Sequence, residues 1–525
     1  MNKLFFNIID VFLLCYGVIV GFYLYMEQTE FIHFELAKWI LFLLCYVIMK
    51  RMRQKQWCLY GIILIGGAEA GIAIGQKIHL IKSFHHVFDV TGTFGNPGPL
   101  GGYLAIAIIV LIGLYREYWR NFRQKWILLA FLILFSTTLV LTESRAGCLA
   151  MFAGIGSLYL FSKKDRKWKF AIFQKLGTII LVLLFIVVTY YCKKDSADGR
   201  LLIWRVSSEM IMDAPFIGHG IGTFEKRYMY YQAQYFNAHP NSQYARLADN
   251  ISYPYNEFLR IGVEFGLIGL FVVLGLIISV FKYASVQGLN KIYLATFTSW
   301  LTFSMFSYPS HVLLLWLLVP FLLGGIQCRK NRCVSVGYKF QIVECMIIII
   351  CLFFIIRYGC DYYLLKNNIR KLYFSSTKTT EEATDYVERH RLELQSIPHL
   401  FDIYAQYCYK NYPASKRIII LKQATTIVPT SDLYCDLGDT YKELNQIDKA
   451  IESYILASNM VPHRILPNYK LFCLYREVGD TVQMLRTGLK ALNTEVKVES
   501  TKTLRMKGDI KKNFEKIVFN LFIEL

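Results

Sequence analysis

Long apolar blocks with almost no charged residues constrain this chain more than any other feature. A helix of about 20 apolar residues crosses a hydrocarbon core roughly 30 Å thick, and blocks such as 176–191 and 265–280 approach that length without a charge. Soluble proteins are about one quarter charged, whereas this chain is 18% charged with a mean hydropathy of +0.36. The sequence therefore predicts an all-α, polytopic helical membrane protein.

The apolar blocks define a predicted membrane domain at residues 1–357. Its first block is long enough to span a bilayer and lacks a small-residue cleavage site, so we expect a signal anchor that is not cleaved. We predict eleven spans, at 5–25, 34–49, 57–76, 99–115, 126–142, 147–162, 173–191, 258–281, 292–307, 311–327 and 341–357.

The net charge of +20 lies mostly in short basic clusters between the apolar blocks. If the N-terminus is cytoplasmic, the clusters that follow the even-numbered spans are all cytoplasmic too, as the positive-inside rule requires. This placement argues against nucleic-acid binding. Because the span number is odd, we expect residues 358–525 outside the cytoplasm. The clusters are 50–55, 116–125, 163–175, 282–291 and 329–339.

Cysteine placement gives no sign of a metal or disulfide framework. The chain has 13 cysteines, and six of them lie inside the predicted spans, where a thiol behaves as a small hydrophobic group. A Cys-x-x-Cys pair and an acidic metal-binding cluster are both missing from the sequence. We therefore predict no metal and no cofactor.

Two soluble regions are predicted on the same side of the membrane. The first is the extracytoplasmic loop 192–257, and a loop of that length is more often functional than a passive connector. The second is the tail, in which Leu437, Tyr441 and Ala457 recur as Leu471, Tyr475 and Ala491 after 34 residues. That period predicts tetratricopeptide-like repeats around 395–495 that bind a protein partner or pack on their own chain.

Two short motifs lie at predicted outer ends of spans. Residues 91–99, which include Asn96, are rich in glycine and proline, and irregular backbone at a membrane boundary lines a cavity or is buried in protein. The second motif, 143–147, contains Arg145. Positive-inside logic disfavours an arginine there unless it binds an anionic group, although snorkelling is the simpler alternative.

Two further motifs belong to the loop and its end. Arg200 and Trp204 would share a helix face at a spacing of four residues, ahead of the Gly-x-Gly pattern in 215–224. No strand precedes that pattern, so a dinucleotide site is not predicted. Glu257 and Glu264 begin the span 258–281, where carboxylates are costly. The alternative for Glu257 is a helix cap or dipole interaction.

In this order, the motifs resemble those of the O-antigen ligase and O-antigen polymerase superfamily of membrane glycosyltransferases. The resemblance covers about 90–270. It rests on the turn 92–97, the Ser-Arg-Ala-Gly step 144–147, the Arg200–Trp204 pair with 215–224, and the Asn256-x-x-Leu and Glu264-x-Gly patterns.

The resemblance implies a metal-independent transfer from an undecaprenyl-diphosphate-linked glycan held in the lipid bilayer. Arg145 and Arg200 would hold the diphosphate through bidentate hydrogen bonds, with Asn96, Trp204, Asn256 and Glu264 in supporting roles. The acceptor would be lipid A–core, a growing glycan or a protein hydroxyl.

The chain departs from the ligase pattern at the expected catalytic base. Where the ligases have a histidine before the motif asparagine, this chain has Tyr255, and a phenol with a pKa near 10 is a poor base at neutral pH. Glu257 and His239 are the candidate replacements. A polysaccharide transporter or flippase and a non-catalytic membrane scaffold for glycan assembly remain the alternative functions.

Overall fold

The computed structural model describes residues 3–27, 32–85, 87–117, 122–161, 190–191, 193–328, 332–335, 357, 360, 362–372, 378–395 and 397–524. Almost all of two predicted spans, 173–191 and 341–357, lie outside these residues. The chain forms two compact units. The first comprises Met1–Met26, Glu35–Lys194 and Pro254–Ile355, and the second comprises Glu27–Phe34, Asp195–Tyr253 and Ile356–Leu525.

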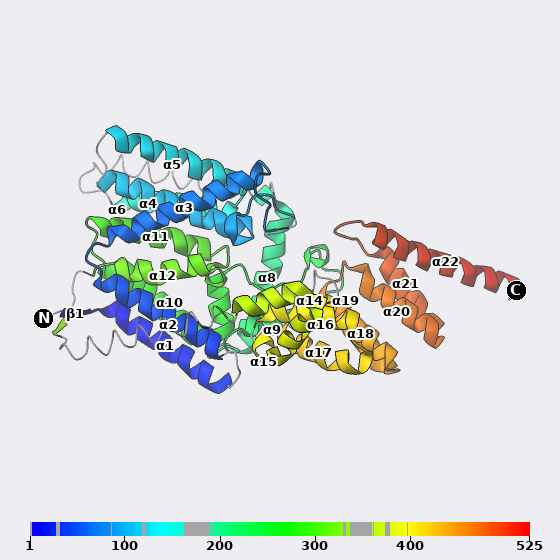
Figure 1. The fold of residues 1–525 in the computed structure, drawn as a ribbon. Coiled ribbons are helices and arrows are strands. Elements are labelled where there is room, and N and C mark those ends of the chain that lie inside the picture. The colour runs from blue at the N-terminus through cyan, green and yellow to red at the C-terminus, as the bar shows by residue number, and fades with distance from the viewer. Residues whose placement is uncertain are drawn as a thin grey trace. The chain divides into compact units, whose positions relative to one another are not determined.

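The first unit contains the apolar helices (Figure 1). Each of the nine predicted spans within the described residues falls on one of them, and five of these helices are long and apolar enough to cross a membrane. The chain is therefore a helical membrane protein, as predicted. The helices are α1 (Ile8–Glu27), α2 (Ile32–Arg51), α3 (Gln56–Lys77), α4 (Pro97–Glu117), α5 (Phe122–Leu141), α6 (Arg145–Phe161), α10 (Glu257–Tyr283), α11 (Leu289–Ser304) and α12 (Leu313–Gly325).

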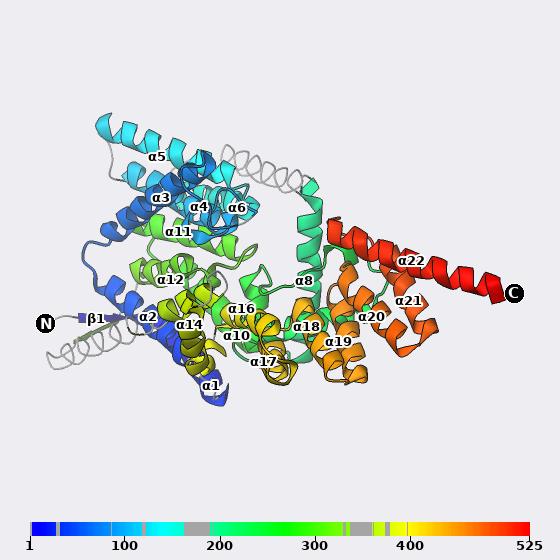
Figure 2. The ribbon, with the colours of Figure 1, turned by 45° about the vertical axis from the view of Figure 1, so that its right-hand side comes forward.

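Helix α4 is buried among four other helices of the first unit. It is apolar on every side and is surrounded by α3, α5, α6 and α11 (Figures 1 and 2), as expected of a helix without a polar face. Small residues let its neighbours approach closely: a Cβ on Gly113 would lie 2.9 Å from Ile292 of α11, and one on Gly102 would lie 2.5 Å from Phe303. The motif 91–99 leads directly into this buried helix.

The described residues also include one short antiparallel strand pair, which the all-α prediction did not contain. Strand β1 (Lys3–Phe6) pairs with β2 (Arg332–Ser335), with Lys3 opposite Ser335. Backbone hydrogen bonding between two segments far apart in sequence leaves no signal in either segment alone, so the pairing was not predictable from local pattern.

The second unit contains helices of 13 or 14 residues that follow one another through short connections (Figure 2). Among these helices, a Cβ on Gly438 would lie 2.4 Å from the Tyr454 ring, so glycine lets α18 and α19 pack closely. Helix α19 ends two residues before Pro462. The helices in the segment where repeats are predicted are α16 (Pro398–Asn411), α17 (Ala414–Ile427), α18 (Ser431–Glu443), α19 (Ile447–Met460), α20 (Ile465–Val478) and α21 (Thr481–Asn493).

Further helices of the second unit come from the loop and from both ends of the tail. The loop helices, α8 (Lys194–Asp213) and α9 (Thr223–Ala238), belong with the tail and not with the membrane helices. This grouping differs from the predicted division at residue 357, which was drawn along the chain and not from contacts. The remaining tail helices are α14 (Lys378–Arg389), α15 (Arg391–Gln395) and α22 (Thr501–Glu524).

Candidate functional site

The motif 91–99 is anchored to α3 by two buried polar side chains. The Thr93 amide donates to Oε2 of Glu69 at 2.8 Å, and the Thr93 hydroxyl donates to Oε1. Oε1 of Gln76 accepts from the amides of Thr91 and Gly92, at 2.9 and 2.8 Å. Gly92 has a φ of +56°, and a Cβ there would lie 2.5 Å from the Glu69 carboxylate. The turn therefore needs glycine and is held in one conformation.

The second motif packs directly against the first. A Cβ on Gly147 of α6 would lie 2.7 Å from the backbone of Gly101 in α4, and the Ser144 hydroxyl donates to the Gly98 carbonyl at 3.3 Å. Oδ1 of Asn96 accepts from the Gly98 amide at 2.9 Å. Asn96 therefore shapes the turn on which the start of α6 rests.

Arg145 is the first residue of α6 and is half-buried. Its guanidinium donates to the Lys193 carbonyl at 3.4 Å, and the Lys193 ammonium pairs with Glu143. Hydrogen bonding to Lys193 lowers the pKa of Glu143. The predicted diphosphate arginine thus lies in a polar cluster at the α5–α6 turn, close to the glycine-rich motif.

The fourth motif forms a buried charge cluster at the start of α10. Arg260 donates to Glu257 through Nε at 2.8 Å and to Glu264 through Nη1 at 2.7 Å. The other Glu257 oxygen accepts from the amide and hydroxyl of Ser310, at 2.9 and 2.6 Å. The Glu257 and Glu264 side chains are only 7% and 4% exposed. Two buried carboxylates therefore share one arginine.

The contacts of Glu257 suit a structural role better than the role of a catalytic base. Both oxygens of Glu257 already accept hydrogen bonds, and they tie α10 to the turn before α12. Asn256 supplies the helix cap, because its Oδ1 accepts from the amides of Phe258 and Leu259. Arg260 was not predicted as a site residue. It lies three residues after Glu257 and four residues before Glu264, and both spacings are typical of ion pairs on a helix.

The charge cluster borders an apolar cavity of about 140 Å³ within the first unit. Its polar lining residues are Glu257, Arg260, Ser304 and Ser310, and aromatic and aliphatic side chains form the rest. Helix α10 also bends beyond the cluster, where Gly266 has a φ of 63° inside the helix. The Glu264-x-Gly pattern is thus a charged residue followed by a kink. The apolar lining includes Tyr16, Trp39, Phe42, Trp300 and Trp316.

The third motif lies in the second unit. Arg200 and Trp204 lie on α8, one helical turn apart as predicted, and both are half-buried. The glycine-rich turn that follows has φ values of 71°, 101° and 68° at Gly218, Gly220 and Gly222. Those left-handed conformations explain the glycines, and the turn leads into α9.

Two histidines of the second unit differ in what their rings contact. Nε2 of His219 lies 2.8 Å from the Met210 carbonyl and Nδ1 lies 3.0 Å from Arg227, so both nitrogens are engaged. His239 follows α9 and is exposed. Its Nδ1 lies 3.0 Å from the Tyr235 carbonyl. A carbonyl only accepts, so Nδ1 carries the proton and Nε2 is the basic nitrogen.

The predicted site residues therefore fall into two groups. The first unit holds Asn96, Arg145, Asn256, Glu257 and Glu264, and the second holds Arg200, Trp204 and His239. Among the described residues, no group of three or more His, Cys, Asp or Glu is placed to hold a metal ion. The assignment of roles to these residues stays a prediction.

A segment that includes α6, the loop and parts of α5 and α10 matches a family model. Residues 129–274 match the family model described as O-antigen ligase, which covers little more than a quarter of the chain. The matched segment contains the second, third and fourth motifs, and the turn at 91–99 precedes it. A search of curated proteins gave no match. The match indicates O-antigen ligase or polymerase-type glycan processing by a membrane protein.

Proposed function

We propose that this chain is a glycosyltransferase that moves a glycan from an undecaprenyl-diphosphate-linked donor to an acceptor hydroxyl. The main observation in support of this proposal is the O-antigen ligase match at 129–274, because the matched segment includes the motifs of Arg145, Arg200 and Asn256. The proposal includes eleven spans, a cytoplasmic N-terminus, and a tetratricopeptide-like solenoid in the periplasm. The reaction then takes place on the outer face of the bacterial inner membrane.

The arginines stabilise the leaving group. In the transfer, the bond between the anomeric carbon and the diphosphate oxygen breaks, and a bond from the acceptor oxygen to that carbon forms. The electron pair leaves with the undecaprenyl diphosphate, whose added charge the guanidinium groups of Arg145 and Arg200 neutralise by bidentate hydrogen bonds. The two arginines supply the positive charge that this step requires, without a metal ion.

The acceptor proton passes to a general base, and the contacts favour His239 over Glu257. Glu257 is buried with both oxygens accepting hydrogen bonds, whereas His239 is exposed and has Nε2 as its basic nitrogen. A base must come within hydrogen-bond reach of the proton that it removes. We expect His239→Ala to abolish transfer at normal protein levels, whereas Glu257→Gln lowers the amount of folded protein.

Membranes from cells that make wild-type, Arg145→Ala or Arg200→Ala protein test the proposal. We expect both variants to accumulate undecaprenyl-linked glycan on the outer face and to lose mature surface glycan, at wild-type protein levels. The control is Arg486→Ala, an exposed arginine of α21. Wild-type glycan in both site variants would refute the arginine assignment and favour a scaffold. Lipid-linked glycan that accumulates on the cytoplasmic face would indicate a flippase.

A further inference from the structure

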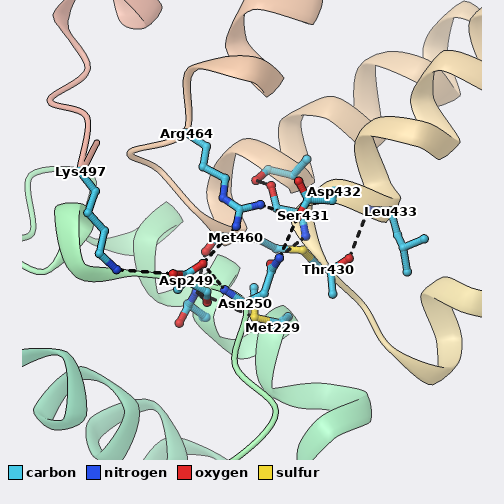
Figure 3. A network of polar contacts seen from close by, with 12 residues as sticks. Met229, Asp249, Asn250, Thr430, Ser431, Asp432, Leu433, Met460, Arg464 and Lys497 are labelled. Atoms are coloured by element: carbon cyan, nitrogen blue, oxygen red, sulfur yellow. Dashed lines mark hydrogen bonds and ion pairs between the residues drawn. The ribbon is translucent and has the colours of Figure 1, made fainter. Parts of the chain in front are cut away.

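The loop and the repeats are joined through a buried glutamine on α9 (Figure 3 shows the surrounding network). Gln232 has no exposed surface. Its Nε2 donates to the Met460 carbonyl at 2.6 Å and to the Asp249 carbonyl at 3.1 Å, and its Oε1 accepts from the Tyr228 hydroxyl at 3.0 Å. A single buried amide therefore bonds to three polar groups, from the loop and from the end of α19.

A second set of contacts joins the end of the loop to the start of two repeats (Figure 3). Asn250 accepts from the Ser431 amide at 3.1 Å and donates to Asp432 at 2.9 Å. Arg464, which precedes α20, pairs with both Asp249 and Asp432. One guanidinium fork thus binds a loop carboxylate and a repeat carboxylate together.

Helix α9 transmits this attachment to α8, the helix of Arg200. The Arg205 guanidinium lies over the Tyr235 ring at 5.3 Å, and the Tyr231 hydroxyl donates to Asp213. His219 contacts the last turns of α8 through the Met210 carbonyl at 2.8 Å. Helix α9 therefore contacts α19 through Gln232, and it contacts α8 through Tyr235 and Tyr231.

We propose that the repeats are a built-in support for the transferase loop, and that Gln232, Asn250 and Arg464 are its positioning residues. The inference rests on the proposed function, because it assigns a catalytic task to the loop. A loop tied to the membrane domain at both ends still has considerable conformational freedom, and ordering it costs backbone entropy. Docking on the repeats offsets that cost and keeps the Arg200 helix in one position.

Hydrogen exchange and transfer activity, measured on the full-length protein, test whether the repeats position the loop. We expect Arg464→Ala and Gln232→Leu to raise exchange in 223–250 while exchange within α18 and α19 stays near wild type. Transfer at saturating donor should fall about tenfold to a hundredfold, because small displacements of reacting groups carry penalties of that size. Arg464→Lys keeps one charge-assisted contact and should recover part of the transfer rate.

The matched control is Lys442→Ala, whose partner Glu477 lies on the neighbouring repeat, with no loop residue in the pair. We expect it to change neither loop exchange nor transfer. If exchange rises throughout α16–α21, the repeats themselves have unfolded, and the milder Asn250→Ala then provides the deciding comparison.

Loop exchange at the wild-type level in Arg464→Ala and Gln232→Leu, or raised loop exchange with wild-type transfer, would overturn the inference. A wild-type chain without transfer activity would instead refute the proposed function. The exchange data in the same samples would still decide whether the repeats hold the loop.

Discussion

We expect Asp436 of α18 to make the stability of the surrounding tail helices dependent on pH. Burial raises the pKa of its carboxyl to about 7, and although Lys470 opposes the shift, Asp439 and Asp432 add to it. In an unfolded chain an aspartate ionises near pH 3.9 (about its ordinary value). Between about pH 4 and pH 7, the folded repeats therefore bind a proton that the unfolded chain has released.

The sign and size of the effect follow from this difference. Because the folded state binds more protons, the free energy of unfolding falls as the pH rises through that window. A pKa raised from about 3.9 to about 7 corresponds to roughly 4 kcal/mol by pH 8, at about 1.36 kcal/mol per pKa unit. Asp436→Asn removes the buried charge, so it should stabilise the repeats by up to about 4 kcal/mol at pH 8 and have little effect near pH 4.

Hydrogen exchange of the α18 amides in the full-length protein measures this prediction. Exchange in Asp436→Asn should be slower than in wild type by up to about a thousandfold at pH 8, and the ratio should shrink at pH 5. The control, Glu452→Gln, changes an exposed carboxyl of α19. Equal exchange in wild type and Asp436→Asn at pH 8, or a larger difference at pH 5, would refute the reasoning.

The remaining predictions concern the membrane unit. Arg260→Met leaves Glu257 and Glu264 buried without their shared cation, which should lower stability by about 3–5 kcal/mol; the thermal midpoint in detergent measures it, and an unchanged midpoint would contradict it. Gly147→Ala places a methyl group against α4 at 2.7 Å and should cost about 1–3 kcal/mol. Gly156→Ala in the same helix, with open space around its Cβ position, is the control and should leave the midpoint unchanged.

The membrane helices were predictable because their signal is local. A run of apolar residues as long as the bilayer is thick can be read from one segment, and each predicted span in the described part of the chain lies on a helix. The positions of Arg200 and Trp204 on one helix were predictable for the same reason. The irregular turn at 91–99 also followed from its own glycines, two of which have positive φ.

The contacts between the loop and the tail helices were not predictable, because their partners lie far apart in the sequence. Gln232 and Met460 are separated by 228 positions, and Asn250 and Ser431 by 181. Nothing in the sequence distinguishes Gln232 from other polar residues of a soluble loop. Its importance arises only from its complete burial and from the carbonyl groups that it meets.

Glu257 shows how one observation in the sequence is compatible with more than one role. The sequence places a carboxylate at the start of a span, where it is costly, and that cost suggested either a catalytic base or a helix cap. In the structure the neighbouring Asn256 is the cap, and Glu257 joins Arg260 and Ser310 across two segments. We therefore expect loss of transfer in a Glu257 variant to accompany loss of folded protein. Because a missing base leaves the fold intact, protein level and thermal midpoint separate the Glu257 variants from those of His239.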